Sequence, residues 1–545
     1  MKGNALALAI GIALPPAALL AQGLDPALLT KPSVDAWPTH HGDYSARRFS
    51  TLKQIDSHNV RSLTLAWIYR ANTSDGGAVI GGEGPEAPPA GGGMAAFGGL
   101  TLKSTPLLVN GVLYFSAPDH VWAVDARTGR ERWHYFWRTR GGIHIGNRGV
   151  GIYGQWLYFL TPDNYFVSLD AATGKERWHT EIASIKREYF SSAAPIIIRN
   201  HVILGVGGDS LDVPGYLESR DPETGEVQWR WYSTPRAGEP GAETWPDEYS
   251  AAHGGGMPWV PGSYDPELNL YYFGTGNANP VLAGQSRAGD NLWTCSIVAI
   301  NPDTGKMAWY YQATRHDTHD WDAAQVPILI DGVIEGKPRK LIAQANRNGH
   351  FFVLDRTNGK SVSSTEYIKT NWMLDYDPKG QPIQNPEKRP QIAGALVTPN
   401  QGGATNWYPP SFSPQTGLFY VNATRAFSVW YIYDASDNPM GWGGTDRGGY
   451  TEQPKLTALD YRTGKIKWSV PRFGGNSGLL TTAGNVLFNS AAGGLGAYNA
   501  TTGEALWNAR VGNAVTNGPI TYELDGLQYV IAGAGSRLVA FVLNQ

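Results

Sequence analysis

Three short stretches of the chain carry oxygen-bearing side chains that match the ligands of a hard metal ion. The stretch His316–Asp322 reads His-Asp-Thr-His-Asp-Trp-Asp, so Asp320 and Asp322 alternate and point to the same side of an extended segment. Asn277 occurs in Gly-Thr-Gly-Asn, and Asp209 occurs in Gly-Gly-Asp. Carboxylates and amide carbonyls are the ligands that hard cations prefer, so these stretches predict a site for such an ion.

Two other interpretations of the same residues stay open. A solvated acidic loop built from Asx turns would need no ligand. Alternatively, His316 and His319 could bind a transition metal. Carboxylates as close as Asp320 and Asp322 disfavour joint ionisation unless a cation or a proton lies between them.

A recurring phrase, Asp-Ala-x-Thr-Gly-x-x-x-Trp and its close variants, indicates the elements that must position these loops. The Asp or Asn opens a turn, the Gly adopts a positive φ, and the Trp on the next strand packs on the neighbouring unit. Each copy follows a short alternating run, so one unit is a small antiparallel sheet. Copies begin at Asp125, Asp170, Asp221, Asn301, Asp460 and Asn499, and a copy without the Trp begins at Asp355.

Such sheets cannot bury their faces alone, and stacking them radially makes a β-propeller. Seven copies are visible, and the 105-residue interval between Asp355 and Asp460 leaves room for a degenerate eighth at Pro409–Val421. We therefore predict an all-β protein, a single eight-bladed propeller over residues 22–545. Two insertions, at about 75–99 and 236–262, are expected as loops on the binding face.

Composition and charge exclude several classes of protein. The 545 residues include 67 glycines, 36 prolines and 20 tryptophans, a turn-rich and aromatic composition unlike that of a coiled coil or a disordered chain. A net charge of −3 gives no overall attraction for nucleic acid. The single cysteine, Cys295, excludes an intrachain disulfide and a CxxCH haem attachment within this sequence, and we expect it to be a small buried apolar residue.

The first 21 residues have the pattern of an export signal, with Lys2 followed by the apolar run Ala5–Leu20. We therefore expect a periplasmic or secreted protein. No later apolar run is long enough to cross a membrane.

The repeats, their Trp phrase and the three acidic or amide loops resemble the pyrroloquinoline quinone (PQQ) dependent alcohol dehydrogenases. The resemblance runs from Trp37-Pro38-x-x-His41-Gly42-Asp43-Tyr44 to the last repeat. It implies an eight-bladed propeller with PQQ and Ca²⁺ or a lanthanide ion on its axis.

The resemblance also implies roles for individual residues. Asn277 matches a metal ligand, Asp320 the catalytic aspartate that also contacts the metal, and Asp322 the extra carboxylate of lanthanide-dependent members. Trp259 matches the tryptophan that stacks on the quinone. The remaining matches are contacts to the cofactor: Arg148 to a quinone carboxylate, Thr161 by a hydrogen bond, Arg347 near the reactive carbonyls, and the pair Asn406 and Trp407.

Three positions depart from the family pattern. The adjacent cysteines that cover the quinone in many members are replaced by Gly142 and Ile143. The metal-binding glutamate falls at Ser210, with the shorter Asp209 beside it as the candidate ligand. A glutamate near the quinone is replaced by Lys103.

These residues predict an exported quinoprotein that oxidises an alcohol. Trp259 would supply a stacking face, Arg148 a partner for carboxylates, and Asp320 the base that takes the alcohol proton while hydride moves to PQQ. Because the sequence has no haem motif, the electrons would leave to a separate acceptor such as a cytochrome c. The alternatives are a propeller that has lost its cofactor and serves as a binding scaffold, and a metal-dependent hydrolase using the acidic cluster.

Overall fold

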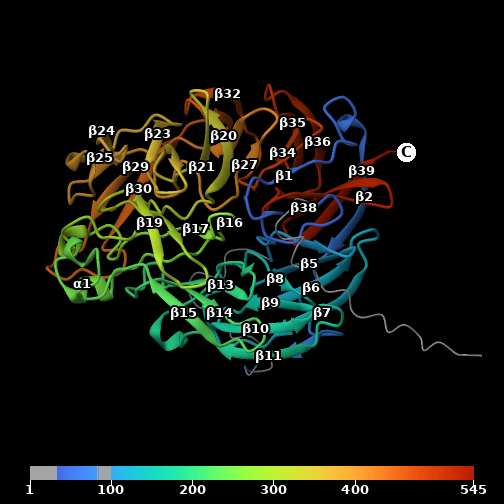
Figure 1. Ribbon diagram of the computed structural model, residues 1–545, viewed down its shortest axis with the longest axis horizontal. Helices are drawn as coiled ribbons and strands as arrows, with labels where there is room; N and C mark the ends of the chain where they lie inside the picture. The colour runs from blue at the N-terminus through green and yellow to red at the C-terminus, as the bar shows by residue number, and fades with distance from the viewer. Residues whose placement is uncertain (1–32, 83, 85–99, 545) are drawn as a thin grey trace, which may run out of the picture.

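The turn-rich repeats fold into eight sheets of four antiparallel strands, arranged as the blades of a propeller (Figure 1). The structure is a computed structural model and describes residues 33–82, 84 and 100–544. The predicted signal, residues 1–21, and most of the predicted loop at 75–99 lie outside the described residues. Within this part of the chain, no helix has the length and apolarity needed to cross a membrane.

The strands of each blade follow the chain from a buried first strand to a more exposed fourth. In that order the blades are as follows: blade 1, β37 (Ile520–Leu524), β38 (Leu527–Ala534), β39 (Arg537–Leu543) and β2 (Leu63–Arg70); blade 2, β4 (Leu107–Val109), β5 (Val112–Ala117), β6 (His120–Asp125) and β7 (Glu131–Trp137); blade 3, β8 (Gly151–Tyr153), β9 (Trp156–Leu160), β10 (Tyr165–Asp170) and β11 (Glu176–Glu181); blade 4, β12 (Ile196–Ile198), β13 (His201–Val206), β14 (Tyr216–Arg220) and β15 (Val227–Tyr232). The ring continues with blade 5, β16 (Ser263–Asp265), β17 (Leu270–Gly274), β18 (Ser296–Ile300) and β19 (Met307–Gln312); blade 6, β20 (Ile328–Ile334), β21 (Lys337–Ala345), β22 (His350–Asp355) and β23 (Ser361–Glu366); blade 7, β27 (Ser411–Ser413), β28 (Leu418–Ala423), β31 (Lys455–Asp460) and β32 (Ile466–Pro471); and blade 8, β33 (Leu480–Thr482), β34 (Val486–Ala491), β35 (Gly494–Asn499) and β36 (Ala505–Arg510).

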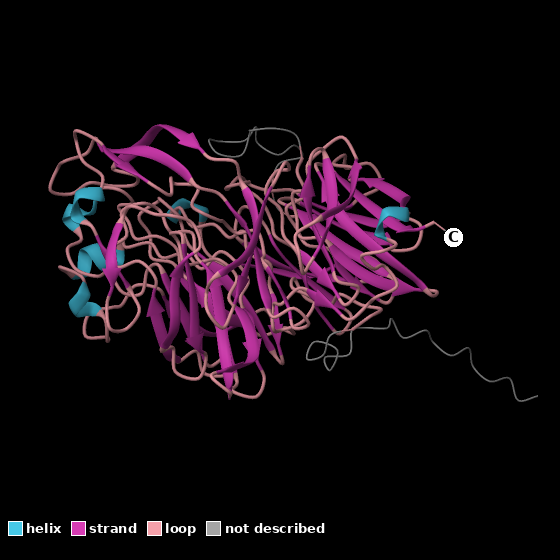
Figure 2. Cartoon of the chain, turned by 90° about the horizontal axis from the view of Figure 1, so that it is seen from above, coloured by secondary structure: helices cyan, strands magenta, loops and turns pink. Residues whose placement is uncertain are grey.

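The remaining strands and short helices lie outside the eight four-stranded sheets (Figure 2). Two short parallel strands extend blades, β1 (Phe49–Ser50) on β33 and β3 (Val79–Gly81) on β7. The hairpin β24 (Met373–Tyr376) and β25 (Pro382–Gln384) and the strand β26 (Ala395–Val397) follow blade 6 in the chain. The strands β29 (Ala426–Ile432) and β30 (Gly444–Thr451) are inserted within blade 7 and form a sheet with β26. The helical pieces are α1 (Glu248–Ala252) and the 3₁₀ turns η2 (Val60–Ser62), η3 (Ile185–Arg187), η4 (Ala242–Thr244), η5 (Gly284–Ser286) and η6 (Pro386–Lys388).

The prediction of eight blades is confirmed, but the position given to the eighth is wrong. Pro409–Val421 contributes β27 and part of β28, and β28 pairs with β31 so that Leu418 lies opposite Asp460. These residues therefore belong to the blade that carries the Asp460 turn. The long interval holds inserted strands instead: β24, β25 and β26 come before this blade, and β29 and β30 lie between its second and third strands.

Blade 1 lacks the repeated phrase because both ends of the chain build it, so no turn joins its third strand to its fourth. The early strand β2 pairs with the final strand β39, with Leu63 opposite Leu543. This pairing closes the ring by hydrogen bonds between segments about 480 residues apart. The second predicted insertion, 236–262, contains η4 and α1 rather than irregular loop alone.

The Trp of the repeated phrase clasps the turn of the next blade. The Trp133 indole lies over Gly174, and its Nε1–H donates to the Ala171 carbonyl at 3.0 Å. The same contact between an indole and the next turn glycine recurs at Trp67–Gly129, Trp178–Gly225, Trp229–Gly305, Trp309–Gly359 and Trp468–Gly503. Glycine is needed at this position for two reasons: the residue has a positive φ, and the indole ring leaves no room for a side chain beneath it.

We expect Gly174→Ala to lower the free energy of unfolding by about 2–4 kcal/mol, because it adds overpacking to left-handed strain. Gly174 has φ +69°, and a Cβ there would lie 2.5 Å from the Trp133 ring. Gly526→Ala is the matched control, since Gly526 has φ +77° with nothing within 4 Å of an added Cβ. The control should lose only about 1 kcal/mol. Urea unfolding of both variants measures the difference, and equal losses would contradict the clasp.

Candidate active site

The predicted site residues come from connections that share one end of the ring. In a four-stranded antiparallel blade, the link between the second and third strands and the link to the next blade leave from the same end. The repeated Asp-x-x-Thr-Gly turns occupy the opposite end. The links between blades carry Arg148, Trp259, Asp320, Asp322, Asn406 and Trp407, and the links within blades carry Thr161, Asp209, Asn277 and Arg347.

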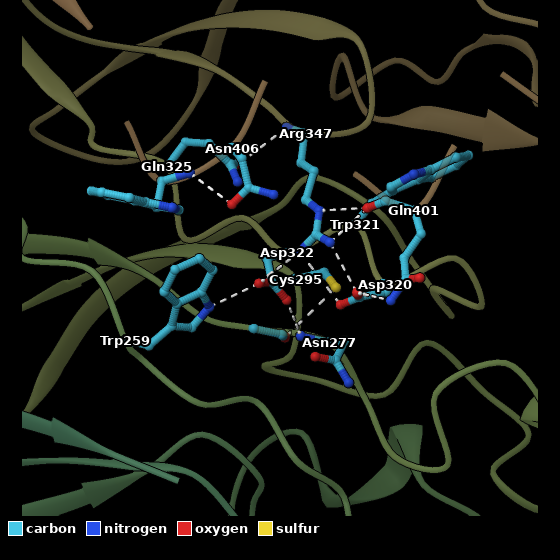
Figure 3. A network of polar contacts seen from close by, with 12 residues as sticks. Trp259, Asn277, Cys295, Asp320, Trp321, Asp322, Gln325, Arg347, Gln401 and Asn406 are labelled. Atoms are coloured by element: carbon cyan, nitrogen blue, oxygen red, sulfur yellow. Dashed lines mark hydrogen bonds and ion pairs between the residues drawn. The ribbon is translucent and has the colours of Figure 1, made fainter. Parts of the chain in front are cut away.

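Arg347 bridges the two alternating carboxylates (Figure 3). Its Nη2 donates to Asp320 Oδ2 at 2.9 Å, and its Nη1 donates to Asp322 Oδ2 at 3.2 Å. Its Nε and Nη2 also donate to the Gln401 carbonyl, at 3.0 and 2.6 Å. All three charged side chains are at most 8% exposed, so this is a buried ion-pair network.

Asp322 joins this network to two more of the predicted residues. Its Oδ1 accepts the Asn277 backbone N–H at 2.6 Å, and its Oδ2 accepts the Trp259 indole N–H at 2.8 Å. The Asn277 side-chain NH₂ donates to Asn279 Oδ1 at 3.1 Å, which turns the Asn277 amide oxygen away from that partner. The Asn279 side chain in turn donates to the Asp209 carbonyl at 2.8 Å.

The carboxyl groups of this cluster are held in a state that favours protons or a cation. Burial raises the pKa of Asp320 well above its ordinary value, although the Arg347 charge opposes the rise. Burial likewise raises the pKa of Asp322, again against Arg347. Burial and the Asp322 charge raise the pKa of Asp209 to about 6. Three carboxyl groups thus share one guanidinium, which leaves them short of positive charge.

Two tryptophan faces enclose a further charged residue, Arg148. The Arg148 guanidinium lies 4.4 Å from the centre of the Trp259 ring and 5.0 Å from that of Trp407. Its Nη1 donates to the Ser192 hydroxyl at 2.5 Å and to the Ser192 carbonyl at 3.0 Å. Its Nε is buried and has no hydrogen-bond partner among the described residues, and burial lowers the pKa of Arg148 to about 9.

Two other predicted contacts are occupied by local hydrogen bonds. The Thr161 hydroxyl donates to Asp163 at 2.6 Å and accepts the Tyr165 N–H at 2.8 Å, so both of its roles are taken within its own turn. The Asn406 side chain donates to the Gly402 carbonyl at 3.1 Å and accepts the Trp407 N–H at 2.8 Å. Their roles toward a cofactor stay predictions.

The structure shows the local environment of the three positions that depart from the family pattern. Gly142 has φ +87°, and a Cβ there would lie 2.0 Å from the Pro162 carbonyl oxygen, so this loop path accepts only glycine. Ser210 is buried and offers no carboxylate. The Lys103 Nζ donates to the Ile145 carbonyl at 2.6 Å, and burial together with the Arg148 charge lowers its pKa.

His316 and His319 do not come together as a transition-metal pair. Nδ1 of His316 contacts the Gly289 carbonyl at 2.9 Å, whereas Nε2 of His319 contacts the Lys388 carbonyl at 2.8 Å. The His319 ring also stacks on Trp321 with centroids 4.2 Å apart. Cys295 is buried and free as expected, and Sγ contacts the Gly276 carbonyl beneath Asn277.

Sequence reasoning missed three polar residues of the site. Gln401 donates to Asp320 Oδ2 at 3.1 Å, Gln325 accepts the Arg347 N–H at 3.0 Å, and Ser192 holds Arg148. None lies in a motif. Gln325 stands three residues after Asp322, and that proximity was the one usable signal.

Comparison with known proteins identifies the family to which this fold belongs. The family model described as glucose/ethanol/alcohol dehydrogenase, beta-propeller domain, of the PQQ type, matches residues 37–371. The chain belongs to the PQQ-dependent quinoprotein alcohol dehydrogenase family. It is an oxidoreductase of that kind. A second model, described as outer membrane protein assembly factor BamB, matches residues 447–545.

Among curated relatives, the chain is similar to quinohemoprotein alcohol dehydrogenase ADH IIB of Pseudomonas putida, with 37% identity over 95% of this chain and 76% of the relative. It is also similar to quinoprotein alcohol dehydrogenase PedH of Pseudomonas putida, with 35% identity over 90% of this chain and 84% of the relative. Among solved structures, the quinohemoprotein alcohol dehydrogenase of Comamonas testosteroni superposes with a TM-score of 0.81 at 35% identity, covering 97% of this chain and 83% of that one.

The donor set fits the two groups that the family implies. Carboxylate and amide oxygens suit a hard cation, and a buried guanidinium between two aromatic faces suits a flat anion such as PQQ. In the described residues, however, no three His, Cys, Asp or Glu side chains surround a common point for metal binding. Arg347 donates to Asp320 Oδ2 and Asp322 Oδ2, so a cation at these oxygens would have to compete with it.

Proposed function

We propose that this chain oxidises a primary alcohol or a related small hydroxyl compound with PQQ and a hard cation, and passes the electrons to a separate acceptor. The observation that carries the proposal is the linked set Trp259–Asp322–Arg347–Asp320, with Asn277 bonded to the same Asp322. It places an acidic base, oxygen donors for a cation and a stacking face in one network. When bound, PQQ supplies the electrophilic carbonyl that accepts the hydride, and the cation polarises it.

Asp320 is the residue that takes the alcohol proton in this proposal. A general base must be within hydrogen-bond reach of the proton and must itself be ionised. Arg347 favours that ionised form, because its guanidinium donates to both Asp320 oxygens, at 2.9 and 3.4 Å. Gln401 adds a third donor at 3.1 Å, which fixes the orientation of the carboxylate.

The other residues bind and orient the cofactor. Trp259 and Trp407 provide planar apolar faces, and Arg148 between them provides a cation for a carboxylate of PQQ. Asn277, Asp209, Asp322 and Asp320 would hold Ca²⁺ or a lanthanide ion. The buried indole N–H of Trp259 holds Asp322 in place, so the stacking face and the metal ligand are oriented together.

The separate acceptor and the compartment are part of the same proposal. The sequence has one cysteine, so this chain cannot attach haem c through CxxCH, and a cytochrome c is the acceptor that we propose. The export pattern in residues 1–21 supports a periplasmic or secreted location.

A cofactor-free scaffold is the second candidate, and Gly142 and Ser210 favour it because the cysteine pair and the metal glutamate are both absent. Reconstitution distinguishes the two. Purified protein is incubated with PQQ and either Ca²⁺ or a lanthanide, desalted, and assayed for quinone absorbance and for dye reduction with a panel of alcohols. We expect about one quinone per chain and alcohol-dependent turnover. If no quinone is retained with any cation, the proposal fails and the scaffold is favoured.

A further inference from the structure

Gln325 lies inside the site network without a role in the function proposed so far. It is 2% exposed and follows the Asp320–Asp322 stretch in the connection between blades 5 and 6. Its side-chain oxygen accepts the Arg347 backbone N–H at 3.0 Å. Its own carbonyl accepts the Gln344 side chain at 2.6 Å, which fixes the backbone on which Gln325 is mounted.

The orientation of the Gln325 amide follows from this contact. A backbone N–H can only donate, so the end of the amide that faces Arg347 must be the oxygen. The NH₂ end therefore faces away from the Arg347 backbone, and it is buried with no hydrogen-bond partner among the described residues. An unsatisfied buried donor destabilises a fold, so native structures keep few of them, and a bound molecule that supplies the acceptor would account for this one.

Gln325 is bonded to a residue that would hold the cofactor. Figure 3 draws Gln325 in the network with Arg347, whose backbone N–H it accepts. The backbone N–H of Arg347 holds Gln325, while the side chain of Arg347 holds Asp320 and Asp322.

We propose that Gln325 is a further cofactor-binding residue whose side-chain N–H donates to a carbonyl or carboxylate oxygen of bound PQQ. The inference rests on the proposed function and extends its site by one uncharged donor. An amide suits this position because it supplies a donor without adding charge to a cluster in which three carboxyl groups already compete for one guanidinium. A lysine here would pair with Asp320 or Asp322 instead.

The test is the affinity for PQQ of Gln325→Glu, measured with Ca²⁺ present by quenching of tryptophan fluorescence. Glutamate keeps the oxygen that accepts the Arg347 N–H, but it replaces the NH₂ by an oxygen that faces an anionic ligand. We expect binding to weaken by about 10- to 100-fold, the range for loss of a hydrogen bond to a charged group. Gln325→Met removes the donor without adding charge, so it should also weaken PQQ binding. This variant replaces Gln325→Glu in the experiment if the glutamate variant does not fold.

Gln381→Glu is the matched control. The Gln381 side chain also accepts from an arginine, Arg315, and its NH₂ group is already bonded to the Gln312 carbonyl at 2.9 Å. This control should bind PQQ like the wild type. If both Gln325 variants bind PQQ as tightly as the wild type, this inference alone is overturned. If the wild-type protein itself does not bind PQQ, both this inference and the proposed function are overturned.

Discussion

Replacing Asp320 by asparagine is expected to lower kcat for alcohol oxidation by about 10²- to 10⁴-fold, the usual contribution of a general base. The asparagine side chain would keep the size and the hydrogen-bond acceptor that face Arg347, but it could not take up the alcohol proton. Asp320 has φ +60°, a conformation that asparagine tolerates better than most residues, so the change should leave the loop intact.

The Asp320 experiment compares turnover at equal loading with PQQ, since the same carboxylate is also a candidate metal ligand. Bound quinone is measured by its absorbance, and kcat is expressed per quinone. Asp525→Asn is the control, because Asp525 also has a positive φ, +53°, but lies in an exposed turn between β37 and β38. An Asp320→Asn enzyme with wild-type turnover per bound quinone would refute the base assignment.

The architecture could be predicted because its determinants are local. The Thr-Gly turn and the following Trp lie within nine residues, and the structure shows why they recur: where the next blade carries the turn, an indole packs over its glycine. Non-local pairing was beyond such reasoning. The junction of Leu63 with Leu543 and the return of the chain to Asp460 depend on which distant strands meet, and no local phrase encodes that.

The candidate site divides in the same way. Residue type and spacing grouped Asp320, Asp322 and Asn277, and the family resemblance added Trp259. The structure joins all four through hydrogen bonds and the Arg347 bridge. Gln325 and Ser192 were missed because their contributions depend on loop paths that a sequence does not specify. The bridging of two carboxylates by Arg347 was missed for the same reason, since sequence resemblance placed that residue only near the reactive carbonyls.

The bridge leads to the second large effect. In the protein without a bound cation, Arg347→Met should lower the free energy of unfolding by about 3–5 kcal/mol at neutral pH, because it leaves buried carboxylates without their partner. Methionine retains the aliphatic stem that packs beside Gly403, so the loss would come from the charge. Arg127→Met is the control, since the pair of Arg127 with Asp525 is largely exposed and should contribute about 1 kcal/mol or less.

The pH dependence of this loss separates charge from packing. Burial already raises the pKa of Asp320 and Asp322, and removing Arg347 raises both further. A folded carboxyl with a raised pKa binds more protons than the unfolded one, so stability falls as the pH rises above the unfolded value of about 3.9. The wild type shares part of this fall, because its own carboxyl pKa values are raised, and the variant loses more only above those values. The deficit of Arg347→Met should therefore be small near pH 3.5 and should grow as the pH rises through neutrality, as measured by urea unfolding at each pH. Added Ca²⁺ or lanthanide should stabilise the variant more than the wild type, because in the wild type the cation competes with the guanidinium. A deficit that is constant with pH and insensitive to cations would mean that Arg347 acts by packing, and that the carboxyl cluster is not a cation site.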